Sequence, residues 1–218
     1  MRHLYILIMV VLSGLYSCEN PPEIAEEFQD VETFYFPNKE RFNAIDLENS
    51  NVNLDDYKTY EELVAAMDKN SCDNKTNVLS FKHNNTHFKI AVFKECSQSR
   101  GVACYRRVDF FDFQNDSLLK TYNSKISPKF FDEKVQVSLD KQLRSPYFNK
   151  EKLRRVLISV HYSHERRNTP VENLKNTLLF ITKTMTEIQE KYDLQISYYL
   201  EIDTTHIPPP PPPPFPKN

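Results

Sequence analysis

The clearest pattern of hydrophobic and polar positions lies in the last third of the chain. Residues 153–162 and 194–203 alternate apolar and polar side chains at period two, which predicts two half-buried β-strands. Their apolar positions are Val156, Ile158, Val160 and Tyr162, then Leu194, Ile196, Tyr198, Leu200 and Ile202. The polar positions between them, Glu201 and Asp203 included, are expected to face solvent.

An amphipathic helix is predicted between these two strands. Thr169, Pro170 and Glu172 match a helix start, with a hydroxyl N-cap, proline at the first helical position and a glutamate that completes a capping box. The apolar residues then recur every three or four positions: Val171, Leu174, Leu178, Ile181, Met185, Ile188 and Tyr192. We expect this stripe to pack on the protein's own sheet in a βαβ unit, with a coiled-coil-like dimer as the alternative.

Weaker patterns in the rest of the body predict one more helix and four more strands. The segments are residues 57–68 for the helix and residues 77–83, 87–94, 102–113 and 133–139 for the strands. Asn84, Asn85 and Thr86 join the strands 77–83 and 87–94 in a predicted hairpin turn, because asparagine tolerates left-handed backbone. We therefore expect a single α+β domain over residues 31–206, with one mixed, mostly antiparallel sheet and a C-terminal strand-helix-strand unit.

The first residues have the layout of an export signal. Arg2 and His3 precede an uncharged apolar run of about twelve residues, shorter than the roughly 20 that a membrane-spanning helix needs. The run ends in Leu15-Tyr16-Ser17-Cys18, which resembles the lipobox of bacterial lipoproteins. The resemblance implies residues 1–17 as a signal peptide, lipid on the sulfur and the amine of Cys18, and residues 18–30 as a lipidated tether. An ordinary cleaved signal and an uncleaved anchor are the alternatives.

Composition excludes several classes of function. Gly14 and Gly101 are the two glycines of the chain, too few for a phosphate-binding loop, a dinucleotide fingerprint or a G-x-S-x-G nucleophile elbow. The net charge of −2 argues against a nucleic-acid binder, and no motif indicates a cofactor. The abundance of Asn, Lys, Phe, Tyr and Ile is similar to that of proteins from Bacteroidota.

Three cysteines remain after Cys18, and an extracytoplasmic compartment permits a disulfide. Cys96 and Cys104 flank a short polar loop, so a bridge between them is the interpretation that we favour. Cys72 is a competing partner, and three reduced cysteines are the other alternative. The spacing does not match that of a zinc site.

Histidines and carboxylates supply only weak candidates for chemistry. His161, His164 and Glu165 form an H-x-x-H-E run and are weak candidates for metal ligands. The preferred interpretation is that they face solvent. His83 and His87 bracket the predicted hairpin turn and could face each other. The neighbouring carboxylates that could serve as acid and base are the pairs Asp55 and Asp56, and Glu201 and Asp203.

The chain ends in a proline-rich tail, residues 207–218, that predicts a polyproline II segment. The tail is either a stiff end or an element that an aromatic groove recognises. The sequence as a whole favours a non-catalytic lipoprotein, held on the outer membrane by its lipid, that binds or assembles with an envelope protein or polymer. An extracytoplasmic hydrolase and an immunity or inhibitor lipoprotein are the alternatives.

Overall fold

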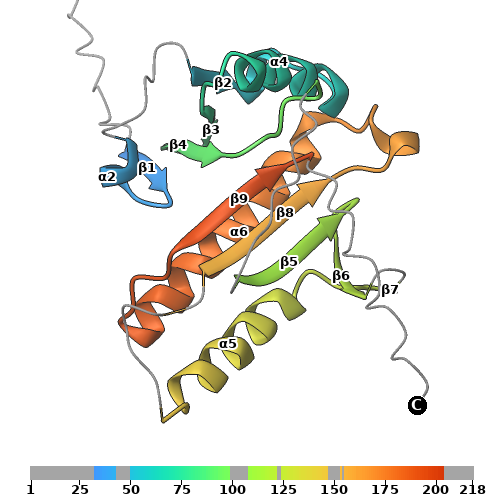
Figure 1. The fold of residues 1–218 in the computed structure, drawn as a ribbon. Coiled ribbons are helices and arrows are strands. Elements are labelled where there is room, and N and C mark those ends of the chain that lie inside the picture. Colours follow the sequence, from blue (N-terminus) through green and yellow to red (C-terminus); the bar gives the residue numbers. More distant parts are fainter. Residues whose placement is uncertain are drawn as a thin grey trace, which may run out of the picture. The chain divides into compact units, whose positions relative to one another are not determined.

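Two mixed β-sheets and the helices packed on them build the α+β fold that the sequence predicts (Figure 1). The computed structural model describes residues 32–42, 50–98, 108–121, 124–146, 153 and 155–203. The four-stranded sheet has the order β1 (Glu32–Phe36), β4 (Thr86–Val92), β3 (Asn77–His83) and β2 (Asn51–Asn53). The five-stranded sheet has the order β7 (Ser124–Ile126), β6 (Ser117–Thr121), β5 (Val108–Gln114), β8 (Arg155–His161) and β9 (Tyr198–Ile202).

Helices connect these strands. They are α2 (Lys39–Phe42), α4 (Tyr60–Cys72), α5 (Phe130–Leu143) and α6 (Val171–Tyr192), with short 3-10 turns η1 (Leu54–Asp56) and η3 (His164–Arg166). The predicted strand-helix-strand unit is β8, α6 and β9, and its two strands are parallel neighbours. Every apolar position that the pattern assigned to the inner faces of these two strands is buried.

The main core lies between the five-stranded sheet and the helices α5 and α6. Phe111 and Phe113 of β5 contact the ring of Phe131 on α5, at centroid distances of 5.3 and 5.2 Å. On α6 the residues Leu174, Leu178, Ile181, Met185 and Ile188 are buried in the same cluster. The apolar stripe of α6 therefore packs on the protein's own sheet, as the sequence predicts.

The four-stranded sheet packs with α4. Leu63, Val64 and Met67 form the buried side of this helix, which confirms the predicted segment. β3 and β4 pair as the predicted hairpin, and Asn84 in its turn has φ 52°. Asparagine takes this left-handed conformation at a lower cost than most residues, so the turn forms without glycine.

The sheet architecture differs from the prediction in two ways. There are two sheets instead of one, joined where the backbone of Phe93, just past β4, hydrogen-bonds to Leu200 and Ile202 at the outer edge of β9. Most pairings between the described strands are parallel instead of antiparallel: β1 with β4, β2 with β3, β5 with β8, and β8 with β9. Strands far apart in the sequence become neighbours, which the short predicted turns did not indicate.

The predicted strand at residues 133–139 is wrong, because this segment lies in the helix α5. Val135, Val137 and Leu139 alternate with polar residues, but Val137 is 61% exposed. The buried positions are Phe131, Val135 and Leu139, four residues apart, which is the spacing of one helix face. The segment showed a period-two pattern because the exposed Val137 lies midway between Val135 and Leu139, which are both buried on one helix face.

The predicted capping box of α6 is also wrong. The N-cap of α6 is Pro170, without a side-chain hydrogen bond, and the backbone amide of Val171 donates to the carbonyl of Lys58. A capping box is present instead on α4, where Thr59 and Glu62 exchange the two hydrogen bonds. Thr59 and Pro170 form an isolated β-bridge, so the two helix starts stabilise each other.

Candidate functional site

The structure separates the three weak metal candidates. His161 ends β8, and its Nδ1 lies 3.1 Å from Oδ1 of Asp112 on β5. His164 and Glu165 lie in η3 and are exposed. In the part of the chain that the structure describes, no three His, Cys, Asp or Glu side chains are placed to hold a metal ion together.

Asp112, Ser159 and His161 share the face of the five-stranded sheet that turns away from α5 and α6. Asp112 and Ser159 are register partners, and His161 follows two residues later on the same strand. A hydroxyl, an imidazole and a carboxylate are the groups of a nucleophilic triad. Ser159 is fully buried, however, and its Oγ has no hydrogen-bond partner among the described residues. The contact between nucleophile and base that such chemistry needs is therefore not formed.

Glu201 and Asp203 do not form the solvated polar pair that the sequence predicts. Glu201 is 1% exposed, and the backbone of Phe93 pairs beside it at this edge of β9. Asp203 adopts a left-handed conformation with φ 54°. Its carboxylate accepts two hydrogen bonds from Nη2 of Arg167, at 3.1 and 3.2 Å. Glu201 is therefore buried, and Asp203 is paired with an arginine of the same chain.

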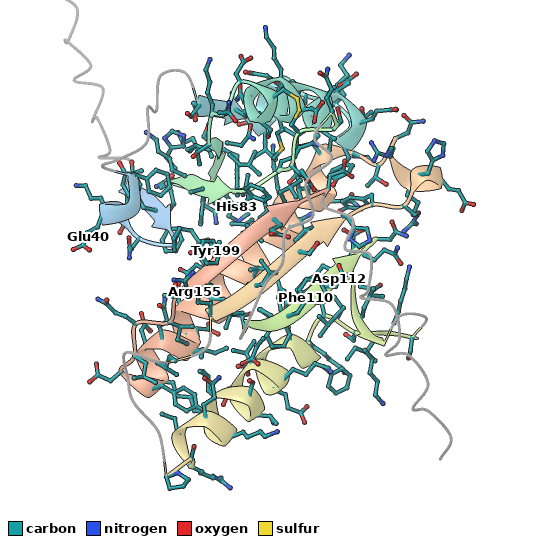
Figure 2. The ribbon with its side chains drawn as sticks, in the orientation of Figure 1. Glu40, His83, Phe110, Asp112, Arg155 and Tyr199 are labelled. Carbon is teal, nitrogen blue, oxygen red and sulfur yellow. A yellow bond between two sulfur atoms is a disulfide. The ribbon has the colours of Figure 1, made fainter. Side chains whose placement is uncertain are left out.

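Aromatic and cationic side chains also lie on the face of the five-stranded sheet that turns away from α5 and α6. Figure 2 shows Arg155, Tyr199, Phe110 and Asp112 on three neighbouring strands. Nη1 of Arg155 donates to the Tyr199 hydroxyl at 3.1 Å, and its guanidinium lies over the tyrosine ring at 5.5 Å. Phe110 is 44% exposed. Because Arg155 lies over the ring of Tyr199, this aromatic face is already covered by a side chain of the same protein.

The remaining polar pairs do not meet either. His83 pairs with Thr86 and His87 pairs with Lys82, so the two histidines point to opposite faces of their hairpin. The expectation that they face each other is wrong, because the turn contains two residues and not three. Asp55 accepts a hydrogen bond from Lys175, and Asp56 accepts one from Asn53 at 3.0 Å.

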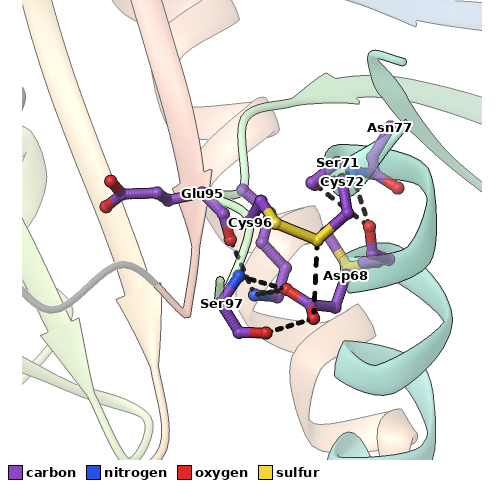
Figure 3. The surroundings of a disulfide bond; sticks show 9 residues. Asp68, Ser71, Cys72, Asn77, Glu95, Cys96 and Ser97 are labelled. Atoms are coloured by element: carbon purple, nitrogen blue, oxygen red, sulfur yellow. Dashed lines mark hydrogen bonds and ion pairs between the residues drawn. A yellow bond between two sulfur atoms is a disulfide. The ribbon is translucent and has the colours of Figure 1, made fainter. Parts of the chain in front are cut away.

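The disulfide joins Cys72 to Cys96, with the Cα atoms 4.8 Å apart (Figure 3). The predicted bridge from Cys96 to Cys104 is therefore wrong, and the competing partner is the correct one. Cys72 is the last residue of α4, and the segment after β4 returns past it, so the fold brings together two cysteines that are 24 positions apart. Cys104 lies outside the described residues.

A hydrogen-bonded network surrounds this disulfide (Figure 3). Asp68 accepts hydrogen bonds from Nζ of Lys94 at 3.0 Å and from the backbone amide of Ser97 at 2.8 Å. The Lys94 side chain is only 4% exposed, and its ammonium group is paired with this carboxylate. Partial burial raises the pKa of Asp68, but the hydrogen bonds from Ser97 and Lys94 outweigh it and hold that pKa below its ordinary value.

A groove lies beside the first half of α6, and we call it the α6 groove. It has a volume of about 340 Å³. Its lining residues are Phe113, Asp116, Pro128, Asn173, Asn176, Thr177 and Phe180. Phe180 contacts the buried ring of Phe113 at a centroid distance of 6.4 Å, so one aromatic wall continues into the core. Pockets with an apolar wall and a few fixed polar groups are typical of binding sites.

Asp116 is the central polar group of the α6 groove. It lies in the turn between β5 and β6, where Asn115 and Asp116 have φ 51° and 62°. Its Oδ1 accepts hydrogen bonds from the Tyr162 hydroxyl and from Oγ1 of Thr177, and its Oδ2 accepts one from Nδ2 of Asn173 at 3.2 Å. Burial raises the pKa of Tyr162, and the Asp116 carboxylate raises it further, so this tyrosine stays a donor. The turn is thereby fixed to α6.

The α6 groove was not predicted from the sequence. Two signals in the sequence point to parts of it. Asn115 and Asp116 are a pair suited to a two-residue hairpin turn, and Asn173, Asn176 and Thr177 have the spacing of one polar helix face. Nothing in the sequence indicates that the turn and this helix face meet.

Several predicted features lie outside the described residues. They are the signal peptide and tether at residues 1–30, with the lipobox and Cys18, the first part of the predicted strand at residues 102–113, and the tail at residues 207–218. Among the helices that the structure describes, none is both apolar enough and long enough to cross a membrane. Comparisons with protein-family models, with curated proteins and with solved structures find no match for this chain.

Proposed function

We propose that this protein is a lipid-anchored binding module of the bacterial cell envelope, displayed outside the cytoplasm, that holds a partner at the α6 groove. The observation that carries the proposal is the arrangement of this groove. A carboxylate fixed by three donors lies beside an aromatic wall and two exposed amide side chains. Such a site is prepared for recognition before a partner arrives, which lowers the entropic cost of binding.

Two further observations support the proposed location. The lipobox at Leu15 to Cys18 implies export and a lipid anchor, and we propose the outer membrane as its destination. The Cys72–Cys96 disulfide suits an oxidising compartment, since disulfides seldom persist in the cytosol. We favour binding over the alternative of a hydrolase because Ser159 is buried and its Oγ does not contact the His161 imidazole.

Metabolic labelling with palmitate tests the anchor. The wild-type chain should incorporate label and fractionate with membranes, and Cys18→Ala should lose both properties. Equal labelling of Cys18→Ala and wild type would remove the lipoprotein from the proposal. Cys104→Ala is the matched control, because it also removes a single cysteine but leaves the lipobox intact.

Photo-crosslinking from the α6 groove tests the binding role. A photoreactive amino acid at Asn176, an exposed position on the groove rim, should yield a defined crosslinked species in living cells. The same group at Glu133, an exposed position on α5, is the control. Identical crosslink patterns from the two positions would contradict a specific partner at the groove.

A further inference from the structure

The α6 groove has an electrostatic character that selects among ligands. Asp116 is the one ionisable side chain among its seven lining residues. The others are aromatic, aliphatic, amide or hydroxyl groups. A ligand in the groove therefore meets one negative charge, and an anionic group such as phosphate or carboxylate is repelled.

The charge on Asp116 is held by neutral groups. Its three donors are the hydroxyls of Tyr162 and Thr177 and the amide of Asn173, none of which is a cation. Among the described residues, no lysine or arginine forms an ion pair with it. Hydrogen bonds from neutral donors leave the negative charge of a carboxylate in place.

Acceptor capacity in the groove is left for a ligand. A carboxylate offers about four acceptor positions, and Asp116 uses three, of which only one is on Oδ2. Asn173 and Asn176 are exposed on the same side of α6, and each has a side-chain carbonyl oxygen. The groove lining therefore offers further acceptors for N–H groups beside the carboxylate of Asp116.

The aromatic wall adds a second element suited to a cation. Phe180 is partly exposed and lines the groove, and an aromatic face attracts an ammonium or guanidinium group within about 6 Å. The methylene stem of a lysine or arginine can lie along Phe180 and Pro128 while its charged end reaches Asp116.

We infer that the α6 groove binds a basic side chain, lysine or arginine, that a partner protein presents. This inference rests on the proposed binding function and names the chemistry of the partner at the same site. A volume of about 340 Å³ suits a single long side chain better than a folded surface. A neutral sugar would donate its hydroxyls to the same acceptors but carries no positive charge to pair with the Asp116 carboxylate.

NMR titration of the ¹⁵N-labelled full chain in detergent micelles tests the inference. The probe is Nα-acetyl-lysine methylamide, and its neutral counterpart is the same compound acetylated at the Nε atom. The charged probe should shift backbone amides of residues 113–116 and 173–180 in a saturable manner, and added salt should weaken its binding. The neutral counterpart should not saturate in the same concentration range.

Asp116→Asn is the discriminating variant. Asparagine accepts a left-handed conformation as readily as aspartate and keeps the size of the side chain, so the turn should persist. The affinity for the charged probe should fall about tenfold. Asp132→Asn removes an exposed carboxylate from α5 and should leave the affinity unchanged. If Asp116→Asn disturbs the fold, Asn176→Ala at the exposed rim supplies a second test with a smaller loss.

Three outcomes overturn the inference: equal binding of the charged and the neutral probe, an unchanged affinity in both Asp116→Asn and Asn176→Ala, or saturable binding of glucose but not of the lysine probe. The last result would identify a site for hydroxyl-rich ligands. The proposed function has separate tests in palmitate labelling and photo-crosslinking. A groove-specific crosslink without lysine binding would therefore reject the basic side chain and leave the binding module intact.

Discussion

Removing the Cys72–Cys96 disulfide is expected to lower the free energy of unfolding by about 3.5 kcal/mol. The bridge closes a loop over a sequence separation of 24 residues. In the chain-entropy model, the loss of such a crosslink returns about 12 cal/mol/K to the unfolded chain, which gives this value at 25 °C. For a domain of this size, the melting temperature should fall by about 7 to 14 °C.

Urea denaturation of the full chain in detergent micelles, followed by circular dichroism, measures this loss. The double variant Cys72→Ala/Cys96→Ala should match the wild type in dithiothreitol, and dithiothreitol should have no effect on the variant. Cys104→Ala is the control, and it should retain the full sensitivity to reduction. If Cys104→Ala abolished that sensitivity, or if the double variant lost less than about 1 kcal/mol, the assigned pairing and its stabilising role would be refuted.

Three further changes test other parts of the fold. Asp68→Asn should cost about 2 kcal/mol at neutral pH. The lowered pKa of Asp68 adds stability that is fully present above the ordinary carboxyl value of 3.8 and is lost as the pH falls through the lowered value. The free energies of unfolding of the variant and the wild type, measured by urea denaturation, should therefore converge at acidic pH. Val135→Ala should lower the free energy of unfolding by about 2 kcal/mol, because Val135 is 1% exposed. Val137→Ala should lower it by less than about 0.5 kcal/mol, because Val137 is 61% exposed. Equal losses of stability in thermal melts would favour a strand over α5. Thr59→Ala should cost about 1 kcal/mol by removing the cap of α4, whereas Thr169→Ala, at a position without a cap bond, should change the melting temperature little; the opposite order would contradict the assigned capping box.

The sequence predicted the C-terminal unit well because its signal is long and consistent. From Val156 to Ile202 the pattern changes from period two to period 3.6 and back, and each period has enough repeats to exclude the other. Residues 133–139 offer only three apolar positions. All three fit one face of a strand, and two of them, Val135 and Leu139, also fit one side of a helix. The segment before them decides the assignment, because Phe131 extends the helical spacing by one more turn.

The features that the sequence could not predict depend on contacts between distant segments. The choice of Cys72 over Cys104 as the partner of Cys96 follows from the return of the chain past the end of α4. At the starts of α4 and α6, a threonine is followed three positions later by a glutamate, and only Thr59 and Glu62 form a capping box. At the start of α6, Pro170 forms a backbone bridge with Thr59 instead. Pattern and spacing describe one element at a time, so neither contact is contained in them.

The same limit explains why the α6 groove was missed, and it also explains why the groove can be well ordered. Leu174 and Leu178 are fully buried, while Asn173, Thr177 and Phe180 beside them line the groove, so the packing that fixes the helix also fixes these side chains. A rotation of α6 by one residue would move a leucine out of the core. The hydrogen bonds to Asp116 tie the opposite wall to the same helix. A partner would therefore bind a site whose geometry is maintained by the hydrophobic core, and little ordering of side chains would oppose its binding.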